Sequence, residues 1–241
     1  GILAFDPTSP FSGGALLGDR IRMQSVSADE GVYIRSMATR GHLGGLALAA
    51  QDAVTVLEAA GYEMILVETV GVGQDEVEVA GLADVTLLLL VPGMGDAVQT
   101  FKAGVMEIAD VFVINKADHG GADCLEREIA AMMGLAPRTD GWRPPILKTI
   151  ATTGEGVEDV RQALENFRSY GEQNSLAQRR EREKWRARIL AMVRQSLLDG
   201  IAGPQLRGRR IESHVEEIME RRRDPHSVVE ELIRDFKAGL G

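Results

Sequence analysis

Short apolar runs alternate with helix-like segments through residues 1–170, and this alternation restricts the fold more than any other feature. Strands that are apolar throughout are typical of sheets buried on both faces, and intervening helices are the usual connections between parallel strands. We therefore predict an α/β fold with a parallel sheet covered by helices on both faces. The expected strands are Ile2–Phe5, Met64–Val67, Val85–Val91, Val111–Ile114 and Ile146–Leu147. The expected helices are Leu46–Ala60, Asp96–Ile108, Ala122–Met133 and Val157–Phe167.

The remaining part of the chain, residues 171–241, shows helical patterns without strands and is predicted to form a helical arm. The expected helices are Ser175–Leu198, Glu212–Arg222 and Ser227–Lys237. The first of them carries an apolar stripe that includes Trp185, Ile189 and Met192, with no partner that the sequence reveals. We expect this stripe to form a homodimer; the alternative is that it packs back on the α/β domain of the same chain.

Charge is distributed unevenly between these two parts. Residues 171–241 hold 15 Lys and Arg against 12 Asp and Glu, whereas the total of 27 basic and 36 acidic residues leaves the α/β part strongly acidic. An acidic body argues against a nucleic-acid partner. The arginine-rich stretch 179–188 alternates with glutamates and is interpreted as a solvated or subunit-facing helix surface.

Cysteine and apolar content indicate the compartment. Cys124 is the one cysteine, which excludes an internal disulfide framework and is typical of a reducing compartment. The longest apolar stretch, Val85–Val91, is far too short to span a bilayer. We expect a cytoplasmic protein with no membrane partner.

The tetrad Asn115-Lys116-Ala117-Asp118 follows directly after the apolar run Val111–Ile114. The carboxylate of Asp118 can accept hydrogen bonds from guanine N1–H and from the exocyclic amine, whereas adenine would leave that acceptor unpaired. Asn115 is expected to tie neighbouring loops together, and the Lys116 stem to lie over the base. The alternative is an ordinary polar exit from a strand. Because ligands of parallel sheets bind at the carboxyl ends of the strands, we favour a guanine site.

Other polar segments also follow predicted strands. Asp6 is a candidate for Mg²⁺ binding through water, or else part of an Asp-Pro turn. Asp19 lies in a loop-to-helix turn, where the alternative is an N-cap. Glu68 ends an apolar strand, where a charge is costly without a partner, and the nearby Gly71 lets backbone N–H groups approach a phosphate. The Ala151 backbone N–H is a candidate donor to guanine O6.

Taken in order, these motifs resemble one family, the MeaB-type GTPase chaperones associated with adenosylcobalamin-dependent methylmalonyl-CoA mutase and once described as arginine/ornithine transport ATPases. The segments that carry the resemblance are Phe5–Ser9, Leu17–Arg20, Val67–Gln74, Pro92–Asp96 and Asn115–Asp118. The resemblance implies a P-loop GTPase that converts GTP to GDP and phosphate, gates adenosylcobalamin loading and protects the mutase.

The resemblance also implies residue roles. Asp6, Asp19 and Glu68 would belong to the Mg²⁺ site, and Glu68 would either hold the metal or orient the attacking water. A switch that senses the mutase would contain Asp96, Gln99 and Lys102.

One departure from the family pattern concerns the Walker A loop, Gly-x-x-x-x-Gly-Lys-Ser/Thr, because the sequence contains no Gly-Lys dipeptide. We expect that segment to precede Gly1, and the present chain alone to be inactive as a GTPase. Two other functions remain open: a transport-associated ATPase or kinase, against which the guanine-type tetrad counts, and a non-catalytic dimeric interaction module.

Overall fold

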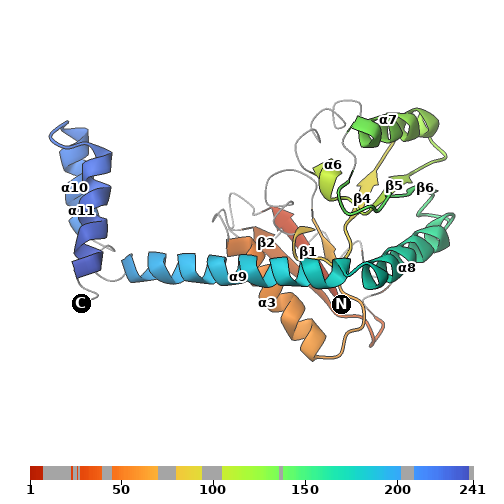
Figure 1. Cartoon of the computed structure of the whole chain (residues 1–241), viewed down its shortest axis with the longest axis horizontal. Helices are drawn as coiled ribbons and strands as arrows, with labels where there is room; N and C mark the ends of the chain where they lie inside the picture. The colour runs from red at the N-terminus through yellow and green to blue at the C-terminus, as the bar shows by residue number, and fades with distance from the viewer. Residues whose placement is uncertain are drawn as a thin grey trace. The chain divides into compact units, whose positions relative to one another are not determined.

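The computed structural model describes residues 1–7, 23, 26, 28–39, 45–69, 80–93, 105–135, 138–201 and 209–238. The chain divides into two compact units, Gly1–Lys184 and Trp185–Gly241. The first unit contains the strands and is drawn from red to cyan in Figure 1. The second contains helices, and the long helix α9 (Leu176–Ile201) runs across the division.

Among the described residues, the first unit contains two three-stranded sheets, and every strand pair in them is parallel. The first has the order β2-β1-β3, formed by β2 (Ile34–Thr39), β1 (Ile2–Pro7) and β3 (Leu66–Glu68). The second has the order β4-β5-β6, formed by β4 (Leu87–Leu90), β5 (Val111–Asn115) and β6 (Ile146–Thr149). The predicted parallel α/β architecture is confirmed.

Strand β5 shows why a fully apolar run was needed in the second sheet. Phe112 and Ile114 pack against α7 (Ala122–Leu135), whereas Val111 and Val113 pack against residues of α8 (Val157–Gln173). Successive side chains of a strand point to opposite faces, so a strand between two helices must be apolar at every position. Figure 1 shows α7 and α8 on opposite sides of these strands.

Helix α3 (Gly45–Ala59) covers the first sheet, where its buried Ala50 and Leu57 contact Leu3 and Phe5 of β1. Its end is fixed by Gly61, which has a φ of 86°. The Gly61 N–H donates to the Glu58 carbonyl at 3.0 Å and the Tyr62 N–H to the Leu57 carbonyl at 3.1 Å. This pair of bonds is a Schellman motif, which satisfies carbonyls that the helix leaves unpaired.

The predicted elements correspond closely to those observed, with shifts of a few residues at their ends. Strand β2 was missed because Ile34-Arg35-Ser36-Met37-Ala38-Thr39 is not an apolar run; it pairs with β1 along its whole length. The predicted helix Asp96–Ile108 is described only as α6 (Val105–Ile108), since residues 94–104 lie outside the described residues.

Helices α10 (Arg209–Met219) and α11 (Pro225–Ala238) belong to the second unit. Asp224 caps α11: its Oδ1 accepts the Ser227 N–H at 3.0 Å, which also lowers the Asp224 pKa. Pro225 then occupies the first helical position, where no N–H is needed. Among the described helices, none is long and apolar enough to cross a membrane.

Candidate functional site: the loop after β5 and the loop after β6

The tetrad leaves β5 beside the end of β6. The register pairs Asn115 with Thr149, so their side chains meet where both strands end. Asn115 Oδ1 accepts hydrogen bonds from Thr149 Oγ1 at 3.2 Å and from the Ala151 N–H at 3.1 Å. The Ala117 N–H adds a bond to the Thr149 carbonyl at 3.0 Å. The expectation that Asn115 ties neighbouring loops together is confirmed.

Lys116 adopts an unusual backbone conformation, with a φ of 56° in the left-handed region. Few residues other than glycine adopt this region, and such outliers concentrate at functional sites. The turn is closed by the His119 N–H, which donates to the Lys116 carbonyl at 2.9 Å. This conformation turns the chain sharply after the buried strand, so that Asp118 follows in an exposed position.

The loop after β6 is closed on itself. The Ile150 N–H donates to the Glu155 carbonyl and the Gly154 N–H to the Ile150 carbonyl, both at 3.0 Å. Gly156 ends this loop with a φ of 74°, and a Cβ there would lie 2.1 Å from the Lys148 carbonyl oxygen. Only glycine fits this position, and the tight closure holds the Ala151 N–H against Asn115.

The acidic member of the tetrad is open to solvent, with 53% of the Asp118 side chain exposed. His119 Nε2 lies 3.9 Å from Asp118 Oδ2, so the carboxylate is not consumed by a close ion pair. Lys116 is also exposed. The Asp118 carboxylate can therefore accept two hydrogen bonds from a planar donor such as a base edge. The Ala151 N–H already donates to Asn115, so donation to guanine O6 would require sharing it.

The residues predicted to hold Mg²⁺ fall on the first sheet or outside the described residues. Glu68 ends β3 and is exposed. Asp6 lies near the carboxyl end of the neighbouring strand β1, whose Ala4 pairs with Glu68, so both acidic residues leave the same end of this sheet. The side chain of Asp6 and the whole of Asp19, Gly71, Asp96, Gln99 and Lys102 lie outside the described residues.

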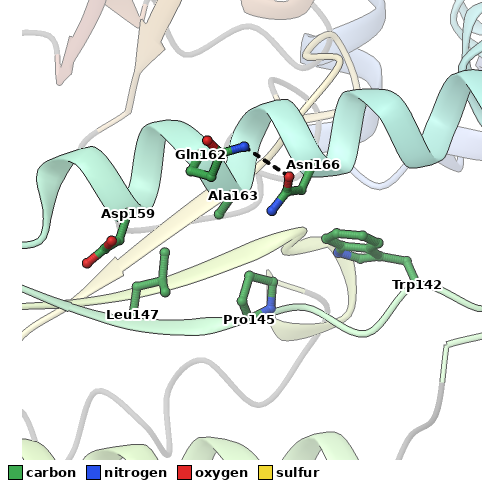
Figure 2. Close-up of a pocket in the computed structure, with 7 residues that line it drawn as sticks. All are labelled: Trp142, Pro145, Leu147, Asp159, Gln162, Ala163 and Asn166. Atoms are coloured by element: carbon green, nitrogen blue, oxygen red, sulfur yellow. Dashed lines mark hydrogen bonds between the residues drawn. The ribbon is translucent and has the colours of Figure 1, made fainter.

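A hollow lies between β6 and α8 (Figure 2). It is lined by Trp142, Pro145, Leu147, Asp159, Gln162, Ala163 and Asn166. Its two amide side chains bond each other, with Gln162 Nε2 donating to Asn166 Oδ1 at 3.1 Å. The hollow shares no residue with the tetrad.

Comparison with known proteins gives the family. The family model described as methylmalonyl Co-A mutase-associated GTPase MeaB matches residues 1–205. The chain belongs to the MeaB family. The predicted family resemblance is confirmed, and the family is one of GTPases associated with methylmalonyl-CoA mutase. Membership in a GTPase family implies guanine nucleotide binding.

Relatives cover most of the chain. A protein of Pyrococcus abyssi named as a GTPase is 44% identical over 242 residues, which are 99% of this chain and 74% of the relative. The mitochondrial methylmalonic aciduria type A homolog of Mus musculus is 41% identical over 170 residues, which are 69% of this chain and 41% of the relative.

A solved structure described as a LAO/AO transport system kinase is similar in fold, with a TM-score of 0.68. It is 23% identical, and the match covers 98% of this chain and 71% of that chain. The predicted P-loop GTPase-type fold is confirmed at the level of architecture.

Sequence reasoning missed a cluster of charges at the opposite end of β5. Asp110, which is 0% exposed, is bound by Arg138 and by Arg180 of α9. The interpretation of stretch 179–188 as solvated or subunit-facing is therefore wrong for Arg180. It is also wrong for Lys184, which pairs with Asp84 at 2.6 Å. No local pattern marks these pairs, because Asp110 and Arg180 are 70 residues apart.

Proposed function

We propose that this chain reads guanine through Asp118 as part of a GTPase that serves methylmalonyl-CoA mutase. The observation that carries the proposal is the Asn115 bridge, which joins the β5 exit to the Ala151 loop and leaves the Asp118 carboxylate exposed. A rigid loop with an unengaged carboxylate loses little conformational entropy when a base binds. Family membership indicates that the nucleotide is a guanine nucleotide, and the tetrad contains the residues proposed to recognise its base.

Hydrolysis is proposed for the protein that also carries a Walker A loop. Phosphoryl transfer to water depends on positioning and electrostatics and needs no covalent enzyme intermediate. Bound Mg²⁺ would supply charge neutralisation at the β- and γ-phosphates. Asp6, Asp19 and Glu68 are the proposed ligands, and the exposed position of Glu68 at the end of β3 is compatible with this role. Glu68 alternatively orients the attacking water.

The proposed partner is adenosylcobalamin-dependent methylmalonyl-CoA mutase, whose cofactor loading the GTPase would gate. Asp96, Gln99 and Lys102 are the proposed switch that reports the nucleotide state. We also propose a homodimer formed through α9, whose Trp185, Ile189 and Met192 are each more than half exposed in the single chain. An apolar stripe of that kind is typical of an interaction surface.

Competition binding tests the base preference. A fluorescent guanosine diphosphate is bound to the protein and then displaced with unlabelled GDP, ADP or XDP, with Mg²⁺ present throughout. GDP should displace the probe at much lower concentration than ADP, because adenine leaves the Asp118 carboxylate without donors. Equal displacement by ADP would favour a transport-associated ATPase or kinase instead.

Calorimetry with a purified cobalamin-dependent mutase tests the partner. If the nucleotide changes the affinity for the mutase, the mutase must change the affinity for the nucleotide by the same factor. We expect different mutase affinities with GDP and with a non-hydrolysable GTP analogue. Equal affinities would contradict the switch, and no binding in either state would contradict the partner.

A further inference from the structure

Asp110 is the most completely buried charged residue among the described residues, and helix α9, the residue before β4 and the loop that contains Arg138 meet on its carboxylate. Arg180 Nη1 and Nη2 donate to its two oxygens, each at 2.8 Å, in a two-pronged pair. Arg138 Nη2 lies 3.1 Å from Oδ1, and the Thr86 N–H donates to Oδ2 at 2.9 Å. Such a fork-to-fork arrangement fixes orientation as well as charge.

The cluster is extended by Asp140, which bonds Arg138 through both of its oxygens. Two arginines and two aspartates therefore face one another, and their charges balance. A buried aspartate without a partner would be strongly unfavourable, and one of the two arginines that pair with Asp110 comes from α9. The N-terminal part of α9 thus supplies an arginine that neutralises a buried carboxylate of the α/β unit.

Aromatic contacts hold Arg180 in this position. Its guanidinium lies 4.9 Å from the ring centre of Phe167, a buried residue of α8. Phe167 contacts Trp142 edge-on, and Trp142 Nε1 donates to the Asp110 carbonyl at 2.8 Å. The side chain of Arg180 is 23% exposed, which is low for an arginine on a helix surface. Its place is therefore defined by packing as well as by charge.

The cluster sets the register at which β5 begins. The Asp110 N–H donates to the Thr86 carbonyl at 2.8 Å, while the Asp110 carboxylate accepts the Thr86 N–H, so these two residues start the pairing of β4 with β5. Arg138 Nη1 also donates to the Ala109 carbonyl at 2.8 Å. From Asp110 the strand runs five residues, about 17 Å, to Asn115.

The other end of that strand leads into the tetrad Asn115–Asp118, which we call the guanine-recognition loop after its proposed function. Asn115 reaches Thr149 and Ala151 only in the register that pairs Asn115 with Thr149. A shift of one residue would turn its side chain to the other face of the sheet. The four residues between, Val111 to Ile114, are buried, so the strand has little freedom to adjust between its ends.

We propose that Arg180 is a positioning residue for the guanine-recognition loop: it acts through Asp110 and β5, and it thereby couples helix α9 to nucleotide binding. This inference rests on the proposed function only where it concerns nucleotide binding. A partner or second copy that moves α9 changes guanine affinity by this route.

Amide hydrogen exchange of the full chain, measured without nucleotide, tests the structural coupling between Arg180 and the loops after β5 and β6. The reporters are the Ala117 and Ala151 amides, which bond to Thr149 and Asn115. In Arg180→Ala both should exchange faster by at least about tenfold. The Tyr62 amide at the end of α3 lies in the other sheet's core and should be unchanged. A uniform increase at all three amides would mean global destabilisation and would overturn the proposal.

Two matched variants on α9 separate the route through Asp110 from general loosening of the helix. Arg179→Ala removes the exposed neighbouring arginine, and Lys184→Ala breaks the contact with Asp84 without touching Asp110. Neither should change exchange at Ala117 or Ala151. If Lys184→Ala has the same effect as Arg180→Ala, the route through Asp110 is wrong.

The conservative variant and the double variant make the test sharper. Arg180→Lys keeps the charge but not the two-pronged geometry, so it should restore part of the protection. Asp110→Asn should speed exchange at the same two amides, and adding Arg180→Ala to it should add little, because both act through one contact. Additive effects would contradict the coupling.

GDP binding measures the effect of Arg180 on nucleotide affinity. Arg180→Ala should weaken GDP binding on the order of tenfold, with Arg179→Ala at wild-type affinity. If wild-type protein binds no guanine nucleotide while the amides respond as described, the proposed function fails and the structural coupling stands. If the amides do not respond, the inference fails whatever the nucleotide affinity.

Discussion

The two ends of β5 carry aspartates in opposite environments. Asp110 before the strand is 0% exposed and is bound by two arginines, whereas the Asp118 side chain beyond it is 53% exposed and has His119 at 3.9 Å. A buried carboxylate must be matched by fixed partners, because burial without them is costly. An exposed carboxylate keeps its hydrogen-bonding capacity for a ligand. One end of the strand therefore holds the structure, and the other is available for binding.

The largest effect is expected from Asp110→Ala, which removes the carboxylate that pairs with Arg180 and the acceptor of the Thr86 N–H. Removing one partner of a buried charge pair typically costs about 3–5 kcal/mol in the free energy of unfolding. We expect a loss at the lower end, about 3 kcal/mol, because Asp140 remains beside Arg138. Urea unfolding followed by circular dichroism measures it. Asp118→Ala is the control and should unfold at the wild-type urea midpoint.

Next in size is Asp118→Asn, which should change binding and leave stability unaltered. The variant loses a charged acceptor for guanine N1–H, so GTP affinity should fall by about 2 kcal/mol, or roughly thirtyfold. Xanthosine triphosphate should bind better, because its base presents an acceptor where guanine has an amine. Isothermal titration calorimetry measures the affinity for both nucleotides. An unchanged GTP affinity would contradict the assignment of Asp118 to the guanine site.

Asp140 should give a smaller effect that depends on pH. The hydrogen bond from Arg138 lowers the Asp140 pKa in the folded protein. A lowered folded pKa stabilises the fold above the unfolded value of about 3.9, and this contribution is lost as pH falls below that value toward the folded pKa. Asp140→Asn should therefore cost about 1 kcal/mol at pH 7, and the difference from wild type should shrink below about pH 4.

Urea midpoints of wild type and Asp140→Asn between pH 7 and pH 3 test this sign. A difference that grows as the solution is acidified would contradict the assignment. The comparison must be made at constant salt concentration, because screening also weakens charge interactions.

The smallest effect is expected at Lys148, which pairs with Asp123 and Glu126 at 2.6 Å on the surface of the second sheet. These bonds raise the Lys148 pKa, but exposed ion pairs contribute little because water screens them. Lys148→Met should leave the urea midpoint within experimental error, and any difference should vanish in high salt. A loss as large as that of Asp110→Ala would contradict the distinction between buried and exposed charges.

The tetrad loop, Asn115–Asp118, was predictable because its signals are local. The tetrad is contiguous and follows a buried run, and the Ala151 loop follows the next strand. Parallel strands bring their carboxyl ends to one edge, so sequence order alone indicated that the two loops meet. Strand β2 was not predictable in the same way, because Ile34–Thr39 is neither an apolar run nor a regular alternation of apolar and polar residues.

Helix α9 also combines features that the sequence predicts with features that depend on tertiary packing. Its helical character and its exposed apolar stripe were predicted from spacing, and Trp185, Ile189 and Met192 are indeed exposed in the single chain. Arg179 and Arg180 are indistinguishable in the sequence, yet the first is exposed and the second lies over Phe167 and against Asp110. The rotation of α9 about its own axis determines which of the two arginines faces Asp110.

The parallel α/β class, the family and the position of the tetrad follow from the amino-acid sequence, because periodicity and contiguous motifs carry them. The bond from the Ala151 N–H to Asn115 and the neutralisation of Asp110 by Arg138 and Arg180 become visible only in the folded chain. Those contacts join residues from 28 to 70 positions apart, and they form only when buried strands and helices pack in one register. Burial then makes the charge pairing obligatory, because an unpaired carboxylate inside the protein is strongly destabilising.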